Sequence, residues 1–133
     1  MPHTIQPRTI IREMVVEDTT GLPMWEILVP TAGNDGTPFS VRHHRTWDEH
    51  VKSLAGGMTL LKPVRGSWVD PSSSAEYTER MIPVRIVCTE AQIIEICKET
   101  ARMYDQVAVL VTLVAERTIF VTNPNATGAG SPT

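Results

Sequence analysis

The chain has 133 residues, a length that suits one domain with a core of its own. Its formal net charge is -3 at pH 7. Only 5% of its residues are aromatic, so the core must be mainly aliphatic. No basic stripe is present to meet a nucleic acid, and no apolar run reaches the roughly 18 residues of a membrane span. We therefore expect a single domain over residues 1–133, with flexible ends at 1–8 and 123–133, that acts in the cytoplasm away from nucleic acid and membrane.

Two extended segments come first along the chain. Residues 9–16 are β-branched and apolar, and residues 24–31 form a second run after the turn-forming residues 17–23. The two strands could pair as a hairpin across residues 18–21. Alternate side chains of the second strand form two faces, with Trp25, Ile27 and Val29 on one and Met24, Glu26 and Leu28 on the other.

A short helix is predicted over residues 47–55, after a loop at 32–45. Thr46 has the chemistry of an N-cap, and Glu49 follows it at capping-box spacing. Gly56 and Gly57 should end the helix. Its apolar face consists of residues at helical spacing: Trp47, His50, Val51 and Leu54.

The next predicted strand, residues 58–70, contains a defect. Pro63 cannot donate to a β-ladder, so it predicts an edge strand or a bulge. Gly66 predicts a second irregularity or a close approach of another backbone segment. Residues 71–80 are polar, begin with a proline and three serines, and predict a loop. A clear strand follows at 81–89, with one apolar face made of Ile82, Val84, Ile86 and Cys88.

The second helix, residues 90–105, has the most regular pattern. Thr89 is its expected N-cap and Gln92 completes a capping box. Its buried stripe is predicted to hold Ile93, Ile96, Cys97, Thr100, Ala101 and Tyr104. Residues 107–122 form the last predicted strand, with a break near Glu116 and Arg117.

Without the first strand, the order is strand, helix, strand, strand, helix, strand. This order predicts an α+β fold of the ferredoxin-like βαββαβ plan, with an antiparallel sheet and both helices on one face. Right-handed crossovers would place strands 24–31 and 81–89 in the middle of the sheet. By this element order the chain resembles small ferredoxin-like oligomers, both the dimeric α/β-barrel proteins and the trimeric PII-like proteins. The resemblance implies a homodimer or homotrimer, and in the PII-like case a functional loop at 71–80.

Both faces of the last predicted strand are apolar, although two helices can cover only one face of the sheet. Val107, Val109, Val111, Leu113 and Ala115 alternate with Ala108, Leu110 and Val114. At roughly 25 cal/mol per Å², leaving several such side chains in water forgoes several kcal/mol. We therefore expect a second copy of the chain to cover them. The alternative is that residues 9–16 and the loop at 32–45 fold over that face.

Candidate chemistry concentrates in residues 42–50, which contain three of the four histidines. His43, His44 and His50 are candidate catalytic acids or bases, together with Glu26 on a central strand. If Glu26 pairs with Arg65 or Arg85, its role becomes structural. The histidine spacing matches no metal-ligand set, so we expect neither a metal ion nor a cofactor.

An anion site is the second candidate. Free N–H groups at the start of the first helix, near Thr46, could hold a carboxylate or phosphate with Arg42 and Arg45. Arg65 and Trp68 could add a guanidinium and an aromatic wall.

Three functions follow from these features. The first is a cytoplasmic homo-oligomer that binds a small, anionic ligand at the sheet or subunit boundary. The alternative is a small-molecule enzyme of the dimeric α/β-barrel type, an isomerase, lyase or monooxygenase. The third is a regulatory interaction module that acts through the loop at 71–80.

Overall fold

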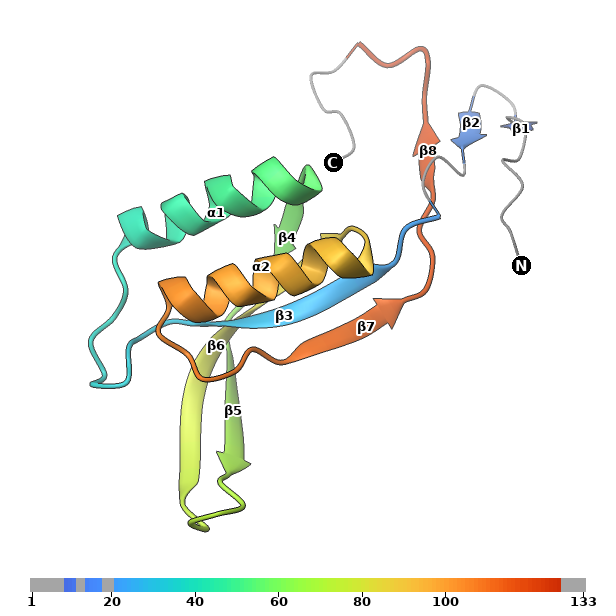
Figure 1. Cartoon of the computed structure of the whole chain (residues 1–133). Helices are drawn as coiled ribbons and strands as arrows, with labels where there is room; N and C mark the ends of the chain where they lie inside the picture. The colour runs from blue at the N-terminus through green and yellow to red at the C-terminus, as the bar shows by residue number, and fades with distance from the viewer. Residues whose placement is uncertain (1–8, 12–13, 18–20, 128–133) are drawn as a thin grey trace.

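The computed structural model describes residues 9–11, 14–17 and 21–127, and shows two α-helices packed on one face of a five-stranded sheet (Figure 1). The predicted flexible end at 1–8, residues 128–133 of the other one, and residues 18–20 of the predicted turn lie outside the described residues. No helix in the described part of the chain is long and apolar enough to cross a membrane.

The strand order confirms the predicted ferredoxin-like plan. β3 (Met24–Pro30) and β6 (Glu76–Val87) pair antiparallel at the centre of the sheet. β7 (Val111–Ala115) pairs with the other side of β3. β4 (Met58–Leu60) and β5 (Val64–Val69) both pair with β6, so they divide one edge of the sheet between them. The interruption between β4 and β5 falls at Pro63, as predicted.

α2 (Glu90–Met103) begins where the sequence predicts, with Thr89 and Gln92 in a complete capping box. α1 (Val41–Ala55) begins earlier than predicted, because Ser40 is the N-cap and accepts a hydrogen bond from the His43 N–H. The predicted N-cap, Thr46, is therefore wrong: it lies inside the helix. The predicted end is right, since Gly56 caps α1 with a φ of 77°, where glycine has no Cβ clash.

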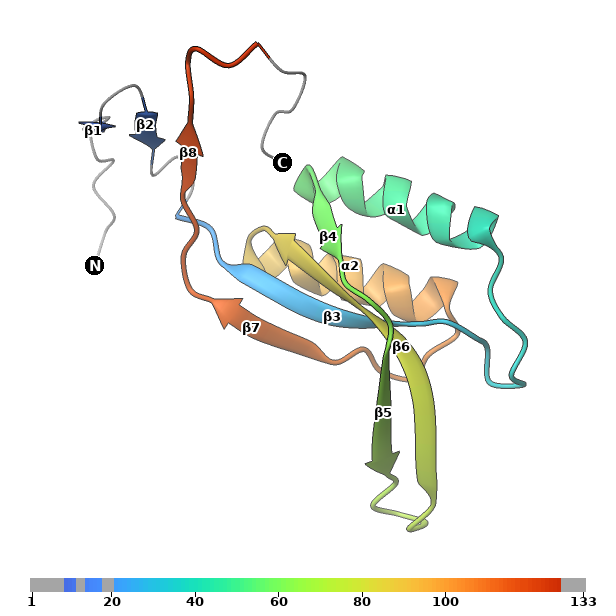
Figure 2. The same cartoon turned by 180° about the vertical axis from the view of Figure 1, so that it is seen from behind.

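The core lies between the two helices and the sheet, and it is mainly aliphatic. Its buried side chains come from both helices, the two central strands and the segments next to them: Ile27, Val29, Trp47, Val51, Val84, Ile86, Cys88, Ile93, Ile96 and Tyr104. The predicted apolar faces of β3 and β6 both point into this layer. The opposite face of the sheet carries no helix (Figure 2).

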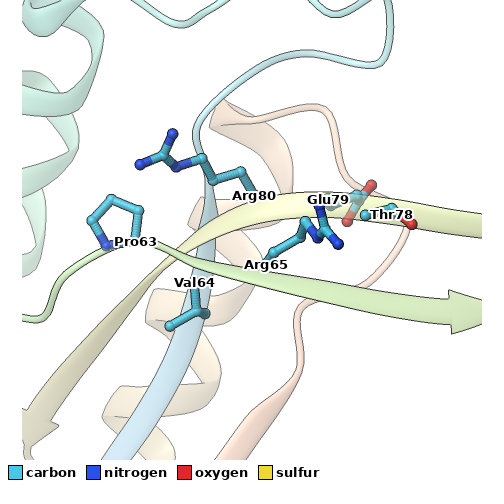
Figure 3. Close-up of a pocket in the computed structure, with 6 residues that line it drawn as sticks. All are labelled: Pro63, Val64, Arg65, Thr78, Glu79 and Arg80. Atoms are coloured by element: carbon cyan, nitrogen blue, oxygen red, sulfur yellow. The ribbon is translucent and has the colours of Figure 1, made fainter.

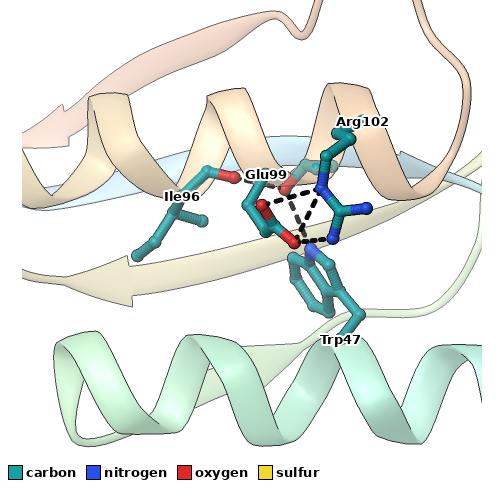
Figure 4. Close-up of polar contacts among 5 residues, drawn as sticks. Trp47, Ile96, Glu99 and Arg102 are labelled. Carbon is teal, nitrogen blue, oxygen red and sulfur yellow. Dashed lines mark hydrogen bonds and ion pairs between the residues drawn. The ribbon is translucent and has the colours of Figure 1, made fainter.

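One polar contact joins the two helices inside the core (Figure 4). The Trp47 Nε1–H donates to the Thr100 hydroxyl at 2.9 Å, and this hydroxyl donates to the Ile96 carbonyl at 2.6 Å. Trp47 and Thr100 are both fully buried. The hydroxyl of Thr100 therefore satisfies an indole N–H that water cannot reach.

We expect Thr100→Val to lower the free energy of unfolding by about 1–3 kcal/mol, because the shape is kept while the Trp47 N–H loses its acceptor. The matched control is Thr46→Val on the exposed side of α1, which should change stability by less than about 0.5 kcal/mol. Urea unfolding followed by far-UV circular dichroism measures both variants. Equal stability of the two variants would contradict this role for Thr100.

Two predictions in the middle of the chain are wrong. Gly66 is not an irregularity, because it pairs in register with Glu79 and a Cβ there would meet nothing within 4 Å. The predicted loop at 71–80 is a short turn, because β6 already begins at Glu76. The Asp70 carboxylate holds this turn by accepting bonds from the N–H and hydroxyl of Ser72.

The first predicted strand does not pair with residues 24–31. β1 (Thr9–Ile11) and β2 (Met14–Glu17) pair with each other, and β2 pairs with β8 (Phe120–Thr122) in a separate three-stranded sheet. The physical reason is that β6 and β7 already occupy both edges of β3. The last predicted strand is divided between β7 and β8, with the break at 116–119, as its sequence suggests.

Candidate functional site

Apolar side chains are exposed along both edges of the five-stranded sheet. On the β7 side, Leu110 is 65% exposed and Leu113 is 46% exposed. On the opposite edge, Val64, Trp68 and Val69 of β5 are similarly open. The final apolar segment, which the sequence predicts to be covered, is therefore exposed in the single chain. β1 and β2 do not supply it, because they pair with β8.

An ion pair occupies the uncovered face of the sheet. Arg85 Nε donates to Glu26 Oε1 at 3.2 Å, and the two residues stand opposite each other on β6 and β3. Glu26 therefore forms a structural ion pair with Arg85, which is one of the two roles that the sequence allows for it. His43 and His44 contact groups in the helical layer, so the structure does not bring them together with Glu26.

His43 and His44 belong to an aromatic cluster where the first turn of α1 meets the end of α2. Phe39 stacks on His43 with ring centroids 4.8 Å apart, and Phe39 also meets Tyr104 edge-on at 4.8 Å. His44 Nδ1 lies 2.7 Å from the Tyr104 hydroxyl. We call Phe39, His43, His44 and Tyr104 the imidazole cluster. His50 lies further along α1 and is not part of it.

Burial sets the charge states in this cluster. Burial, and secondly the neighbouring His43, lower the pKa of His44, while Asp48 acts in the opposite direction. Burial also raises the pKa of the Asp48 carboxyl and that of the Tyr104 hydroxyl. Burial in this cluster therefore favours the neutral form of His44.

The anion site predicted near Thr46 does not have the expected geometry. α1 begins at Val41, so the N–H groups at its positive end precede Thr46. The Thr46 hydroxyl donates to the carbonyl of Arg42, one turn back. Arg42 and Arg45 are exposed on the first turns of α1.

A groove of about 430 Å³ lies on the hairpin formed by β5 and the first half of β6 (Figure 3). We call it the hairpin groove, and its lining residues are Pro63, Val64, Arg65, Thr78, Glu79 and Arg80. Arg65 and Arg80 stand directly opposite each other on the two strands. Figure 3 shows Arg65 extending toward Glu79 and Arg80 extending toward Pro63. In the described part of the chain, neither guanidinium forms an ion pair.

A second groove, of about 460 Å³, adjoins the first and shares Thr78, Glu79 and Arg80 with it. We call it the loop groove, because the loop between β3 and α1 forms its other wall: Pro30, Thr31, Ala32, Gly33, Asn34 and Gly36, with Tyr77 and Met81 from β6. Tyr77 is held by Trp68, whose ring stacks on it at 4.7 Å. Trp68, predicted as an aromatic wall, therefore supports Tyr77 by stacking on it, and Tyr77 lines the groove.

Sequence reasoning found Arg65 but missed Tyr77, Glu79 and Arg80. These three lie within residues 71–80, whose polar sequence predicts a loop. A usable signal was present, because Trp68 and Tyr77 stand symmetrically about the turn, as expected for cross-strand partners of a hairpin.

Metal and thiol chemistry find little support among the described residues. No three histidine, cysteine, aspartate or glutamate side chains in that part of the chain come together to hold a metal ion. Cys88 and Cys97 are free thiols. Burial raises the pKa of Cys88 to about 11, which keeps it protonated and unreactive at neutral pH.

No protein-family profile matches the chain, and no curated protein matches it in sequence. Among solved structures, it is similar to a phage SAM lyase in complex with S-methyl-5'-thioadenosine, with a TM-score of 0.57 and 14% identity, over 77% of this chain and 90% of the lyase. An apo phage SAM lyase has a TM-score of 0.51 and 11% identity, over 83% and 96% of the two chains. CutA from Synechococcus elongatus has a TM-score of 0.47 and 10% identity, over 84% and 87%. At these identities, the likeness to the two structures with a TM-score above 0.5 shows the fold alone.

Proposed function

We propose that the protein is a homo-oligomer that binds a small anionic ligand in the hairpin groove. The observation that carries this proposal is the pair Arg65 and Arg80, which are cross-strand partners and line the groove without ion-pair partners among the described residues. Like charges directly opposite each other destabilise a β-ladder. A carboxylate or phosphate in the groove would offset this repulsion and accept charge-assisted hydrogen bonds from a guanidinium.

The groove also favours a ligand with more than one kind of group. Glu79 also lines the groove and offers an acceptor to a cationic or N–H-bearing part of the ligand. Tyr77 offers a flat apolar surface in the adjoining loop groove. An amphoteric molecule with an anionic end therefore fits the lining better than a bare anion.

Self-association is supported by the apolar side chains at the two edges of the sheet. We propose that a second copy covers them, in a homodimer or homotrimer. The uncovered face of the sheet is a poorer contact, because burying Glu26 and Arg85 there would remove water from both charges. Contact at the edges avoids this cost. It buries Leu110 and Leu113 where the β7 edge forms the contact, and Trp68 where the β5 edge does.

Two measurements test this function on the purified chain. Light scattering coupled to gel filtration should give a mass of two or three chains. Isothermal titration with inorganic phosphate and with citrate, at constant ionic strength, should show saturable binding that Arg65→Met weakens. A single-chain mass at all concentrations would overturn the first half of the proposal, and the absence of binding by both anions would overturn the second.

A specific candidate activity is the cleavage of S-adenosylmethionine. The two structures of TM-score above 0.5 reported above are both phage SAM lyases. Here Arg80 would hold the carboxylate of the substrate, and Glu79 would face the sulfonium. If the substrate's own carboxylate oxygen attacks its γ-carbon, the S–C electron pair returns to sulfur and no co-reactant is needed.

We expect the wild-type chain to release S-methyl-5'-thioadenosine from S-adenosylmethionine, as followed by reversed-phase chromatography. Glu79→Gln should lower the rate by about tenfold or more, since a carboxylate near the sulfonium is lost. Glu49→Gln on the exposed side of α1 is the matched control and should keep the wild-type rate. Release no faster than spontaneous breakdown would exclude the lyase while leaving anion binding intact.

A further inference from the structure

The loop between β3 and α1 forms one wall of the loop groove, and it is largely bonded to itself. The Gly33 N–H donates to the Thr37 carbonyl at 2.8 Å, and the Gly36 N–H donates to the Gly33 carbonyl at 2.9 Å. The Thr37 N–H donates to Asp35 Oδ1 at 2.9 Å. One bond leaves the loop, because Asn34 Nδ2 donates to the Asp105 carbonyl just past α2 at 3.4 Å. The loop can still move largely as a unit, since most of its bonds are internal.

Phe39 packs this loop against the helical layer through its aromatic ring. Its N–H donates to the Thr31 carbonyl at 3.1 Å, and a Cβ on Gly33 would lie 3.9 Å from its ring, so the loop rests on Phe39. The other side of the ring rests on His43 and Tyr104. The loop that forms this wall of the loop groove therefore packs on the imidazole cluster, which we call its platform.

The platform is poorly suited to a positive charge. His43 Nε2 is buried and has no hydrogen-bond partner among the described residues. His44 is partly buried and faces His43 and Asp48 from its own helix and Tyr104 from the end of α2. Asp48 favours a charged His44, but burial and His43 outweigh it and lower the pKa of His44.

We propose that protonation of the imidazole cluster in mildly acidic solution releases Phe39 and loosens the loop at 31–39, which opens the loop groove. The direction follows from linkage, because a group whose pKa is lowered in the closed state loses its stabilising effect as the pH falls. This device would regulate the ligand site that we propose above. The loosening itself needs no ligand, so it can be tested separately.

Hydrogen exchange of the ligand-free protein tests the loop directly. Between about pH 7.5 and about pH 5.5, after correction for intrinsic rates, the loop amides should lose about tenfold of their protection. The amides of Gly33, Gly36 and Phe39 report on the loop, and that of Ile93, bonded to Thr89 in α2, reports on the rest of the fold. Equal losses in both places, or no loss in the loop, would overturn the proposal.

A double variant separates the cluster from other titrating groups. His43→Gln with His44→Gln keeps two polar side chains of similar reach but removes both imidazoles, so protection in the loop should no longer depend on pH. His50→Gln, on the same helix but outside the cluster, should keep the wild-type pH dependence. Loss of the dependence in His50→Gln, or its persistence in the double variant, would show that another group controls the loop.

Discussion

Leu110→Glu is expected to convert the assembled protein into single chains. Leu110 is 65% exposed in the isolated chain and lies just before β7, outside the strand pairing, so its replacement should leave the fold intact. In the proposed oligomer it is covered by a neighbouring copy. Burying an unpaired carboxylate there would cost about 3–5 kcal/mol per contact, which weakens association by roughly 100-fold or more.

The matched control is Ile94→Glu. Ile94 is 46% exposed on α2, in the helical layer rather than in the sheet. The same change of charge and polarity at this position should leave the mass of the assembly unchanged. Sedimentation velocity over a wide range of concentrations compares the two variants. A wild-type mass for Leu110→Glu, or dissociation of both variants alike, would show that the β7 edge does not form the subunit contact.

The helices show where sequence reasoning succeeds and where it fails. α2 was predictable because Thr89, Gln92 and the apolar stripe are local signals that agree with one another. The start of α1 was not, because Ser40 and Thr46 are both good N-cap residues. The choice between them depends on Phe39 and the first turn of the helix packing on Tyr104, a residue 60 positions away from His44. Contacts between such distant residues leave no periodic pattern.

The candidate site escaped prediction for a related reason. The alternation of side chains in 76–80 is too short and too polar to indicate a strand by itself. It becomes a strand because β5 pairs with it residue by residue, with Ser67 opposite Thr78 and Trp68 opposite Tyr77. Only then does Arg80 lie opposite Arg65. Arg65 could therefore be predicted from the sequence, whereas the position of Arg80 depends on pairing between β5 and β6.

The second large effect concerns anion binding in the hairpin groove. We expect Arg80→Met to weaken the binding of phosphate or citrate by about 10- to 150-fold, the loss of one or two charge-assisted bonds worth about 1.5–3 kcal/mol. Methionine keeps most of the aliphatic stem and removes the guanidinium. Arg45→Met, an identical change on the exposed side of α1, should leave the affinity unchanged within about twofold.

The stability of Arg80→Met separates a binding role from a structural one. Thr31 donates its N–H and its hydroxyl to the Arg80 carbonyl, at 3.2 and 3.0 Å, so the backbone at this position is held whatever the side chain. Removing one of two like charges on cross-strand partners also removes their repulsion. Arg80→Met should therefore unfold at the same or a slightly higher urea concentration while it binds anions poorly. If instead stability and affinity fall together, Arg80 supports the hairpin rather than a ligand, and the proposed anion site is wrong.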